Sequence, residues 1–351
     1  MNTPRSASRP VNISPRIPVI AVAGHLGAGK TSLLNHLLRA PGARLGVVVN
    51  DFGALNVDAA LVSGQVDEAA AISGGCICCL PDAGGLDDAL EKLTQPRLGL
   101  DAIVIEASGA ADPITLARLI RFSGAERVRL GGVVEVIDAV EHFQTVDTWP
   151  EPPLRHAVAT LVVVTKADLI PETERHDRIE RIRSRVLERN PAALVVEARQ
   201  GRIDPALVFD TASTEDPIDE LPIARLLRED APAHVGHEHA HAVSVALPEA
   251  VAPGALVDLL EDPAEGAYRM KGRVRVRGPR GGRGYLVNVV GRMIHVARLA
   301  QPPEVGELVA IGIELDEVSA ERRLREVAAG PIAAPDAAGL KRLLRYRRLS
   351  D

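Results

Sequence analysis

Residues 24–31, Gly24-His25-Leu26-Gly27-Ala28-Gly29-Lys30-Thr31, decide the fold. They fit the pattern G-x-x-x-x-G-K-[ST] of the loop that binds the phosphates of nucleoside triphosphates. An apolar run at 18–23 leads into this phosphate loop, and a helical pattern at 32–38 follows it. Because strand, loop and helix come in the required order, the sequence predicts a nucleotide site rather than an ordinary glycine-rich turn.

The residues of the phosphate loop have distinct expected roles. Backbone N–H groups would turn toward phosphate oxygens at the positive end of the following helix. Lys30 would reach the β- and γ-phosphates, and the Thr31 hydroxyl would bind Mg²⁺. The predicted phosphate-binding residues are Gly24, Gly27, Ala28, Gly29, Lys30, Thr31 and Ser32.

The size and composition of the chain suggest two domains and exclude several partners. A length of 351 residues is long for one hydrophobic core. Aromatic residues make up only 2% of the chain, which argues against a stacking platform for single-stranded nucleic acid. The net charge of −6 gives no general attraction to nucleic acid or anionic membranes, and no apolar run approaches the length of a membrane span.

The order of the apolar and helical patterns predicts the fold class. Near-continuous Val/Ile runs separated by helices are typical of a parallel sheet that is covered on both faces. Expected strands lie at 18–23, 45–49, 101–105, 131–137, 160–164 and 193–196, and helical patterns lie near 30–40, 86–94, 113–122, 172–189 and 204–208. We therefore expect an α/β phosphate-loop domain with a parallel sheet, followed by a smaller α+β domain.

Changes in composition and in hydrophobic periodicity along the chain give the expected domain limits. Residues 1–15 read as a disordered tail without the apolar segment of a secretory signal. Residues 16–210 form the expected nucleotide-binding domain, and the Pro-, acid- and His-containing stretch 211–240 reads as a linker. In the expected second domain, 241–330, we predict strands at 241–247, 272–277, 285–290 and 293–299 and helices at 253–260 and 317–327. Residues 331–351 form a basic helical tail.

A second catalytic element is expected where a strand ends near the phosphate loop. Residues 103–109, Ile-Val-Ile-Glu-Ala-Ser-Gly, fit this position. A carboxylate at Glu106 can hold Mg²⁺ or orient a water molecule on it, and Gly109 can bring a backbone N–H close to the γ-phosphate. Together with Lys30, these residues form the predicted catalytic set.

Residues 165–168, Thr165-Lys166-Ala167-Asp168, are similar to the guanine-reading N-K-x-D of GTPases, with Thr in place of Asn. The Asp168 carboxylate can accept from guanine N1–H and N2–H₂ together, a pair of donors that adenine lacks. The stem of Lys166 would cover the base. The alternative, a charged helix start, is the minority interpretation after a phosphate loop.

All three cysteines lie within four residues, at Cys76, Cys78 and Cys79. So close together they cannot staple a fold through long-range disulfides, which suits a reducing cytoplasm. Thiolates are soft donors for Zn²⁺ and other late transition metals, and three local sulfurs leave one ligand position exchangeable. A disulfide redox switch is the minor alternative.

A histidine tract gives a second candidate metal region. His237, His239 and His241 alternate along the chain, so they would share one face of an extended segment. Neutral imidazole binds Zn, Co, Ni and Cu. A polar linker with scattered histidines explains the tract equally well.

These motifs together resemble those of the CobW-type GTPases, a SIMIBI-class metallochaperone family. The resemblance rests on the phosphate loop, on Val48-Val49-Asn50-Asp51-Phe52-Gly53 as a switch segment, on the C-x-C-C at 76–79, and on Glu106–Pro113 (EASGAADP). Residues 165–168 lie where the family's guanine motif lies, and 241–330 looks like its C-terminal domain. The family's switch Glu is Asp51 in this chain, which the resemblance makes a further Mg²⁺ residue.

The resemblance implies hydrolysis of GTP coupled to binding Zn²⁺ or Co²⁺ at Cys76, Cys78 and Cys79 and transferring it to a client metalloprotein. One rival is a GTPase that inserts a metal into one client enzyme. Another is a metal-buffering or sensing protein whose affinity is set by nucleotide. The sequence identifies neither the client protein nor the oligomeric state. A homodimer is one candidate for that state.

Overall fold

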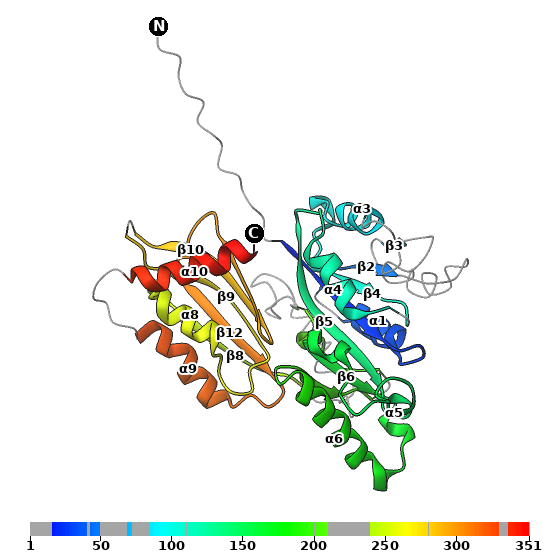
Figure 1. Cartoon of the computed structure of the whole chain (residues 1–351). Helices are drawn as coiled ribbons and strands as arrows, with labels where there is room; N and C mark the ends of the chain where they lie inside the picture. The colour runs from blue at the N-terminus through cyan, green and yellow to red at the C-terminus, as the bar shows by residue number, and fades with distance from the viewer. Residues whose placement is uncertain are drawn as a thin grey trace, which may run out of the picture.

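The structure is a computed structural model that describes residues 16–40, 43–49, 69–71, 84–109, 111–199, 201–209, 239–279, 281–329 and 336–350, and its strands form two sheets (Figure 1). The first sheet has seven strands in the order β3-β2-β4-β1-β5-β6-β7, and every neighbouring pair is parallel. Its strands are β1 (Ile17–Gly24), β2 (Leu45–Val49), β3 (Ala69–Ala71), β4 (Ala102–Glu106), β5 (Val128–Asp138), β6 (Leu161–Thr165) and β7 (Leu194–Glu197).

Helices cover both faces of this sheet because buried side chains alternate along its strands. On one face, Ile20 and Val22 of β1 pack in a cluster with Leu33 of α1. On the other face, Val19 and Ala21 pack with side chains of α3 and α4. The helices are α1 (Lys30–Leu38), α3 (Gly84–Leu93), α4 (Pro113–Arg121), α5 (His142–Thr145) and α6 (Glu172–Arg189), with 3₁₀ turns η2 (Pro96–Leu98), η3 (Leu154–Val158), η4 (Ala167–Leu169) and η5 (Pro205–Leu207).

The second sheet is antiparallel and has the strand order β11-β10-β9-β12-β8. One of its faces packs on three helices, so that Leu256, Leu324 and Leu343 lie in one buried cluster with strand residues. Its elements are β8 (His241–Leu247), α8 (Pro253–Glu261), β9 (Arg269–Val276), β10 (Arg283–Val290), β11 (Met293–Arg298), β12 (Gly306–Gly312), α9 (Glu317–Ala329) and α10 (Ala337–Ser350).

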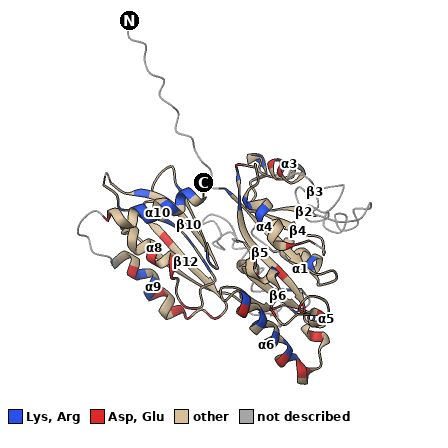
Figure 2. Ribbon diagram, in the orientation of Figure 1, with Lys and Arg blue, Asp and Glu red and all other residues tan. Residues whose placement is uncertain are grey.

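Helix α10 corresponds to the predicted basic tail, and the structure places it in the second core rather than apart from it. Leu343 is fully buried. Arg342 makes ion pairs with Asp258 (2.7 Å) and Glu261 (2.5 Å) of α8. Figure 2 shows the blue residues of α10 close to the red residues of α8. The basic character of the helix is therefore partly neutralised by its own domain.

A connecting segment, residues 201–209, links the two sheets. On one side, Nε2 of His36 in α1 lies 2.7 Å from the Ile203 carbonyl oxygen. On the other side, Arg269 of β9 donates to the Ala206 carbonyl (2.7 Å). Tyr268, directly before β9, and Val290 of β10 are buried in the same cluster as side chains of α1. The two sheets thus share one apolar contact region around this segment.

The expected fold class, a parallel α/β domain followed by an α+β domain, is confirmed. Two strands were not predicted, β3 and β12. The helix expected at 204–208 is the single 3₁₀ turn η5, because Pro205 begins it and Asp204 caps it through the Ala206 N–H. Within the described ranges, no helix combines the length and apolar character needed to cross a membrane.

Candidate nucleotide site

The phosphate loop connects β1 to α1 through two glycines in the left-handed region, Gly27 (φ 76°) and Gly29 (φ 94°). These angles suit glycine because a side chain would be strained there. Lys30 is buried, and its Nζ donates to the carbonyl oxygens of Gly24 (3.1 Å) and His25 (3.2 Å). The ammonium group therefore lies inside the loop that it is predicted to share with phosphates. Ser32 lies exposed in the first turn of α1.

Thr31 and Glu106 meet at the carboxyl ends of β1 and β4. The two strands are neighbours in register, with Val22 opposite Glu106. The Thr31 hydroxyl donates to Glu106 Oε1 at 2.8 Å, and Glu106 is buried. A hydroxyl and a carboxylate are oxygen donors of the kind that Mg²⁺ prefers. The donor set at this point therefore fits the predicted magnesium position.

Gly109 makes a close backbone approach to the phosphate loop. A Cβ at this position would lie 2.7 Å from Leu26 Cα and 2.8 Å from Leu26 N. Real Cβ atoms do not come so near to backbone atoms, so only glycine fits here. The segment after β4 thus reaches the loop directly.

The guanine-motif residues lie at the end of β6. Thr165 is buried, and its hydroxyl donates to the Ala28 carbonyl of the phosphate loop at 2.7 Å. Lys166 has a positive φ of 57° and pairs with Asp138 Oδ2 at 2.6 Å. Asp168 is exposed on η4, and no partner within the described residues occupies its carboxylate. The structure thus brings Thr165 to the phosphate loop and leaves Asp168 accessible.

A buried polar network next to this site was not predicted from the sequence. Glu135 of β5 accepts a hydrogen bond from His156 Nδ1 (2.8 Å) and pairs with Arg155 Nε (2.7 Å). Burial raises the pKa of Glu135, but the His156 hydrogen bond and the neighbouring cations outweigh burial and hold the pKa below its usual range. A charged residue inside the apolar run 131–137 was the signal that could have revealed the network.

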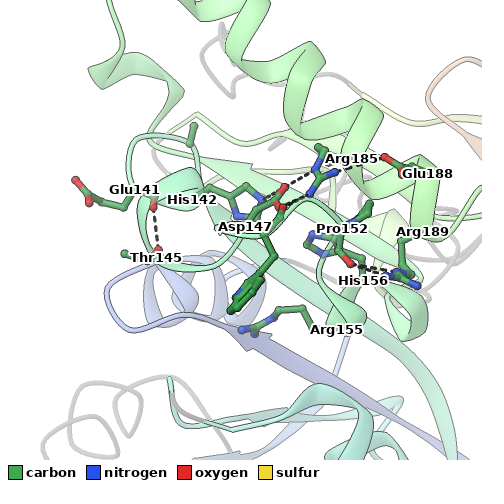
Figure 3. Close-up of polar contacts among 12 residues, drawn as sticks. Glu141, His142, Thr145, Asp147, Pro152, Arg155, His156, Arg185, Glu188 and Arg189 are labelled. Carbon is green, nitrogen blue, oxygen red and sulfur yellow. Dashed lines mark hydrogen bonds and ion pairs between the residues drawn. The ribbon is translucent and has the colours of Figure 1, made fainter.

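The network continues toward α6 (Figure 3). Arg185 binds Asp147 with two nitrogens, at 2.8 Å (Nε to Oδ2) and 2.6 Å (Nη2 to Oδ1). His142 stands beside Asp147 and is 1% exposed, and burial lowers the pKa of His142 to about 4. The loop between β5 and β6 is therefore held by buried charges rather than by apolar side chains alone.

Most of the predicted metal ligands lie outside the described residues: Asp51, Cys76, Cys78, Cys79 and His237. His239 and His241 are described, and they face different acids. His239 Nδ1 is 3.9 Å from Asp204, and His241 Nδ1 is 3.0 Å from Glu317. In the part of the chain that is described, no three His, Cys, Asp or Glu residues cluster as metal ligands.

Comparison with known proteins adds a family to this geometry. A family model described as "CobW/HypB/UreG, nucleotide-binding domain" matches residues 18–197. A model of the cobalamin synthesis protein cobW C-terminal domain matches residues 240–328.

Individual relatives agree with these two matches. The zinc chaperone CobW of Pseudomonas aeruginosa is 31% identical over a 368-residue alignment that covers 90% of this chain and 92% of the relative. The zinc chaperone YjiA of Escherichia coli K12 is 34% identical over 205 residues, or 56% of this chain and 61% of that protein, less than two thirds of its length. A crystal structure of zinc-bound YjiA GTPase from E. coli matches 90% of this chain and 99% of its own chain at 22% identity, with a TM-score of 0.42.

Proposed function

Because this chain belongs to the CobW/HypB/UreG family of nucleotide-binding proteins, we propose that it is a GTPase that binds a divalent transition metal and transfers it to a client protein. The observation that carries the proposal is the meeting of Lys30, Thr31 and Glu106 at the carboxyl edge of the first sheet. The names of relatives, which include zinc chaperones, support zinc as the cargo. Thiolate chemistry in this proposal belongs to the cytoplasm, where cysteines stay reduced.

In this proposal, each described residue has one task during hydrolysis. Lys30 exchanges its carbonyl partners for β- and γ-phosphate oxygens, and Gly109 offers its backbone N–H to the γ-phosphate. Thr31 and Glu106 would hold Mg²⁺, which would neutralise the negative charge that develops on the phosphate oxygens. Thr165, Lys166 and Asp168 hold and read the guanine.

In this proposal the transition metal is the cargo, and Cys76, Cys78 and Cys79 hold it. These residues follow the proposed switch residue Asp51 and precede Glu106 in the chain. Bound nucleotide and bound metal would therefore both change the conformation of the same stretch of chain. If nucleotide changes metal affinity, metal must change nucleotide affinity by the same factor. Reciprocal coupling distinguishes a chaperone cycle from two independent sites on one chain.

Two variants test the proposal with opposite expected results. In a Cys76→Ser/Cys78→Ser/Cys79→Ser variant, Co²⁺ should lose its sulfur-to-metal charge-transfer absorption while GTP affinity remains. In Lys30→Ala, GTP affinity should fall roughly 10- to 100-fold, since hydrogen bonds to charged groups contribute about 1.5–3 kcal/mol, while the cobalt band remains.

Other outcomes would contradict parts of the proposal. Full cobalt absorption in the triple-serine variant would move the metal away from the cysteines, and the His237–His241 tract would then be tested. Metal release without any client protein would favour a buffering protein. Unchanged GTP affinity in Lys30→Ala would remove the nucleotide site itself.

A further inference from the structure

One guanidinium beside the phosphate loop has no task in the mechanism given above. Arg155 lies on η3, and its side chain is 18% exposed. Its Nε stands 2.7 Å from Oε1 of the buried Glu135, whose other oxygen accepts from His156. The guanidinium is therefore held by an ion pair with a carboxylate that is itself hydrogen-bonded, although Nε makes no aligned hydrogen bond in this pair.

The outer edge of the same group is not satisfied in this way. Nη2 of Arg155 is buried and has no hydrogen-bond partner among the residues that the structure describes. A buried donor without a partner costs about 1–3 kcal/mol, and folded proteins keep few of them. A buried, fixed and unsatisfied cationic donor is suited to an acceptor that arrives with a ligand.

The position of Arg155 identifies the ligand. With His25 and Leu26 of the phosphate loop, Arg155 lines one small hollow. In Figure 3 its side chain lies over the blue ribbon of the segment that carries this loop. Leu26 is also the residue that Gly109 approaches. Arg155 therefore stands where the phosphate loop and the segment after β4 converge.

The start of α4 lies within reach of the same charge. The Asp112 carboxylate caps α4 by accepting from Ile114 N and Thr115 N. Partial burial raises the pKa of Asp112, but hydrogen bonds from Thr115 and Ile114 and the charge of Arg155 together lower it. The charge of Arg155 thus acts on the carboxylate that caps the start of α4.

Resting on the proposed GTP hydrolysis, we propose that Arg155 is a further catalytic residue, which donates a hydrogen bond from Nη2 to the terminal phosphate of bound GTP. During hydrolysis the water oxygen bonds to the γ-phosphorus, and the bond to the bridging oxygen breaks with its electron pair going to GDP. Both water protons leave with inorganic phosphate. Negative charge grows on the phosphate oxygens in this step, and a donor fixed in advance stabilises it without reorganisation.

The test compares Arg155→Lys, Arg155→Ala and the control Arg189→Ala. Lysine keeps a cation for Glu135 but has no planar fork with a second donor edge. The lysine variant therefore remains informative even if Arg155→Ala leaves Glu135 with His156 alone and fails to fold. Arg189 of α6 donates to the Pro152 carbonyl (2.7 Å) of the same loop from the other side, so its loss reports on loop order alone.

Steady-state GTP hydrolysis and nucleotide binding should separate the variants. We expect kcat to fall about 10²- to 10³-fold in Arg155→Lys and Arg155→Ala, as for removal of one preorganised transition-state donor. GDP affinity should stay unchanged, and the tight complex with GDP and aluminium fluoride should be lost. Arg189→Ala should keep the native kcat.

Three results would overturn the inference. A native kcat in Arg155→Lys would reduce Arg155 to an ion-pair partner of Glu135. An equal loss in Arg189→Ala would assign the effect to loop order. If the native chain hydrolyses no GTP, the proposed function fails, and the ratio of GTPγS to GDP affinity decides the role of Arg155 instead. An unchanged ratio in Arg155→Lys would then exclude contact with the terminal phosphate, whereas a lower ratio would support it.

Discussion

At the scale of single residues, Thr165 joins the guanine-motif segment to the phosphate loop with one hydroxyl. It donates to the Ala28 carbonyl, and a Cβ on Gly29 would lie 3.7 Å from Thr165 Cγ2. The neighbouring Lys166 is held by Asp138. A short side chain suffices because β6 ends directly against the loop. The two halves of the site are therefore connected before a nucleotide binds.

Asp168 is the residue on which base selection should depend. Asp168→Asn should weaken GTP binding roughly 100-fold, because two hydrogen bonds between a carboxylate and guanine lose their charge. The variant should gain affinity for xanthosine triphosphate, whose base can donate and accept in the complementary pattern. Equilibrium titrations with GTP, ATP and xanthosine triphosphate measure this change.

The matched control is Asp177→Asn, which makes the same chemical change on the exposed surface of α6. It should leave all three affinities at their native values. Equal affinity of the native chain for ATP and GTP would contradict the guanine assignment.

The sequence predicts site residues where their spacing along the chain is itself the motif, and these assignments stay predictions. Lys30 and Thr31 follow from one eight-residue pattern. Arg155 and Glu135 could not be predicted because they are twenty residues apart and meet only when η3 folds back along β5. The local pattern of the sequence does not predict such a long-range contact. Only the single acidic residue in the apolar run 131–137, Glu135, indicates that a partner is needed.

At the scale of elements, the junction of β4 and α4 depends on the absence of a side chain at Gly109. Gly109→Ala would place a Cβ 2.7 Å from Leu26 Cα, a backbone atom that cannot rotate away as a side chain can. Such overpacking costs about 1–3 kcal/mol and should displace the junction. We expect slower GTP hydrolysis and a lower thermal midpoint, measured on the same preparation.

Gly278→Ala offers a comparison in the second domain, where the nearest atom would lie 3.2 Å away. Its effect on hydrolysis should be absent. A native rate of GTP hydrolysis in Gly109→Ala would show that the junction adapts and that hydrolysis does not depend on the close approach.

The network that connects α5, η3 and α6 should make folding sensitive to acid. The folded-state pKa of His142 is about 4, below the ordinary 6.5 of the unfolded chain, because the ring is buried. Between these two pKa values the His142 ring is protonated in the unfolded state and neutral in the folded state. The contribution of His142 to the free energy of unfolding is therefore complete above pH 6.5. The free energy of unfolding falls by up to about 3 kcal/mol as the pH drops to 4.

Denaturant unfolding of the native chain and of His142→Gln at several pH values measures this contribution. The variant should lose part of the decline between pH 6.5 and 4. His176→Gln on the exposed face of α6 should retain the native decline. A native slope in His142→Gln would place the acid sensitivity elsewhere.

Elements with strong patterns were predicted well, and weak ones were not. β2 and α6 occupy the expected 45–49 and 172–189. β3 consists of three alanines, which have neither the length nor the apolar bulk that predicts a strand. Its pairing with β2 is decided by the sheet edge rather than by its own residues.

At the scale of the whole molecule, the shared cluster around the connecting segment should make the two sheets unfold together. Phe209 ends this segment and is 1% exposed in the cluster that also holds Tyr268 and Val290. Phe209→Ala should destabilise the chain by about 3–5 kcal/mol, the usual cost of emptying a buried aromatic site. Differential scanning calorimetry should then resolve two transitions in place of one.

Phe122→Ala removes the same ring from a position that is 78% exposed. Its effect should stay within about 0.5 kcal/mol, as for most surface substitutions. One undivided transition in Phe209→Ala would mean that other contacts couple the sheets.

The connecting segment also limits how freely such domains can be exchanged between relatives. Residues 201–209 contact His36 on α1 and Arg269 on β9 at the same time. A chimera joined at residue 240 would keep one partner of the segment and replace the other. Recombination should therefore succeed only when both contacts are inherited as a set, so the segment and its two partners form one unit of exchange that crosses the boundary between the sheets.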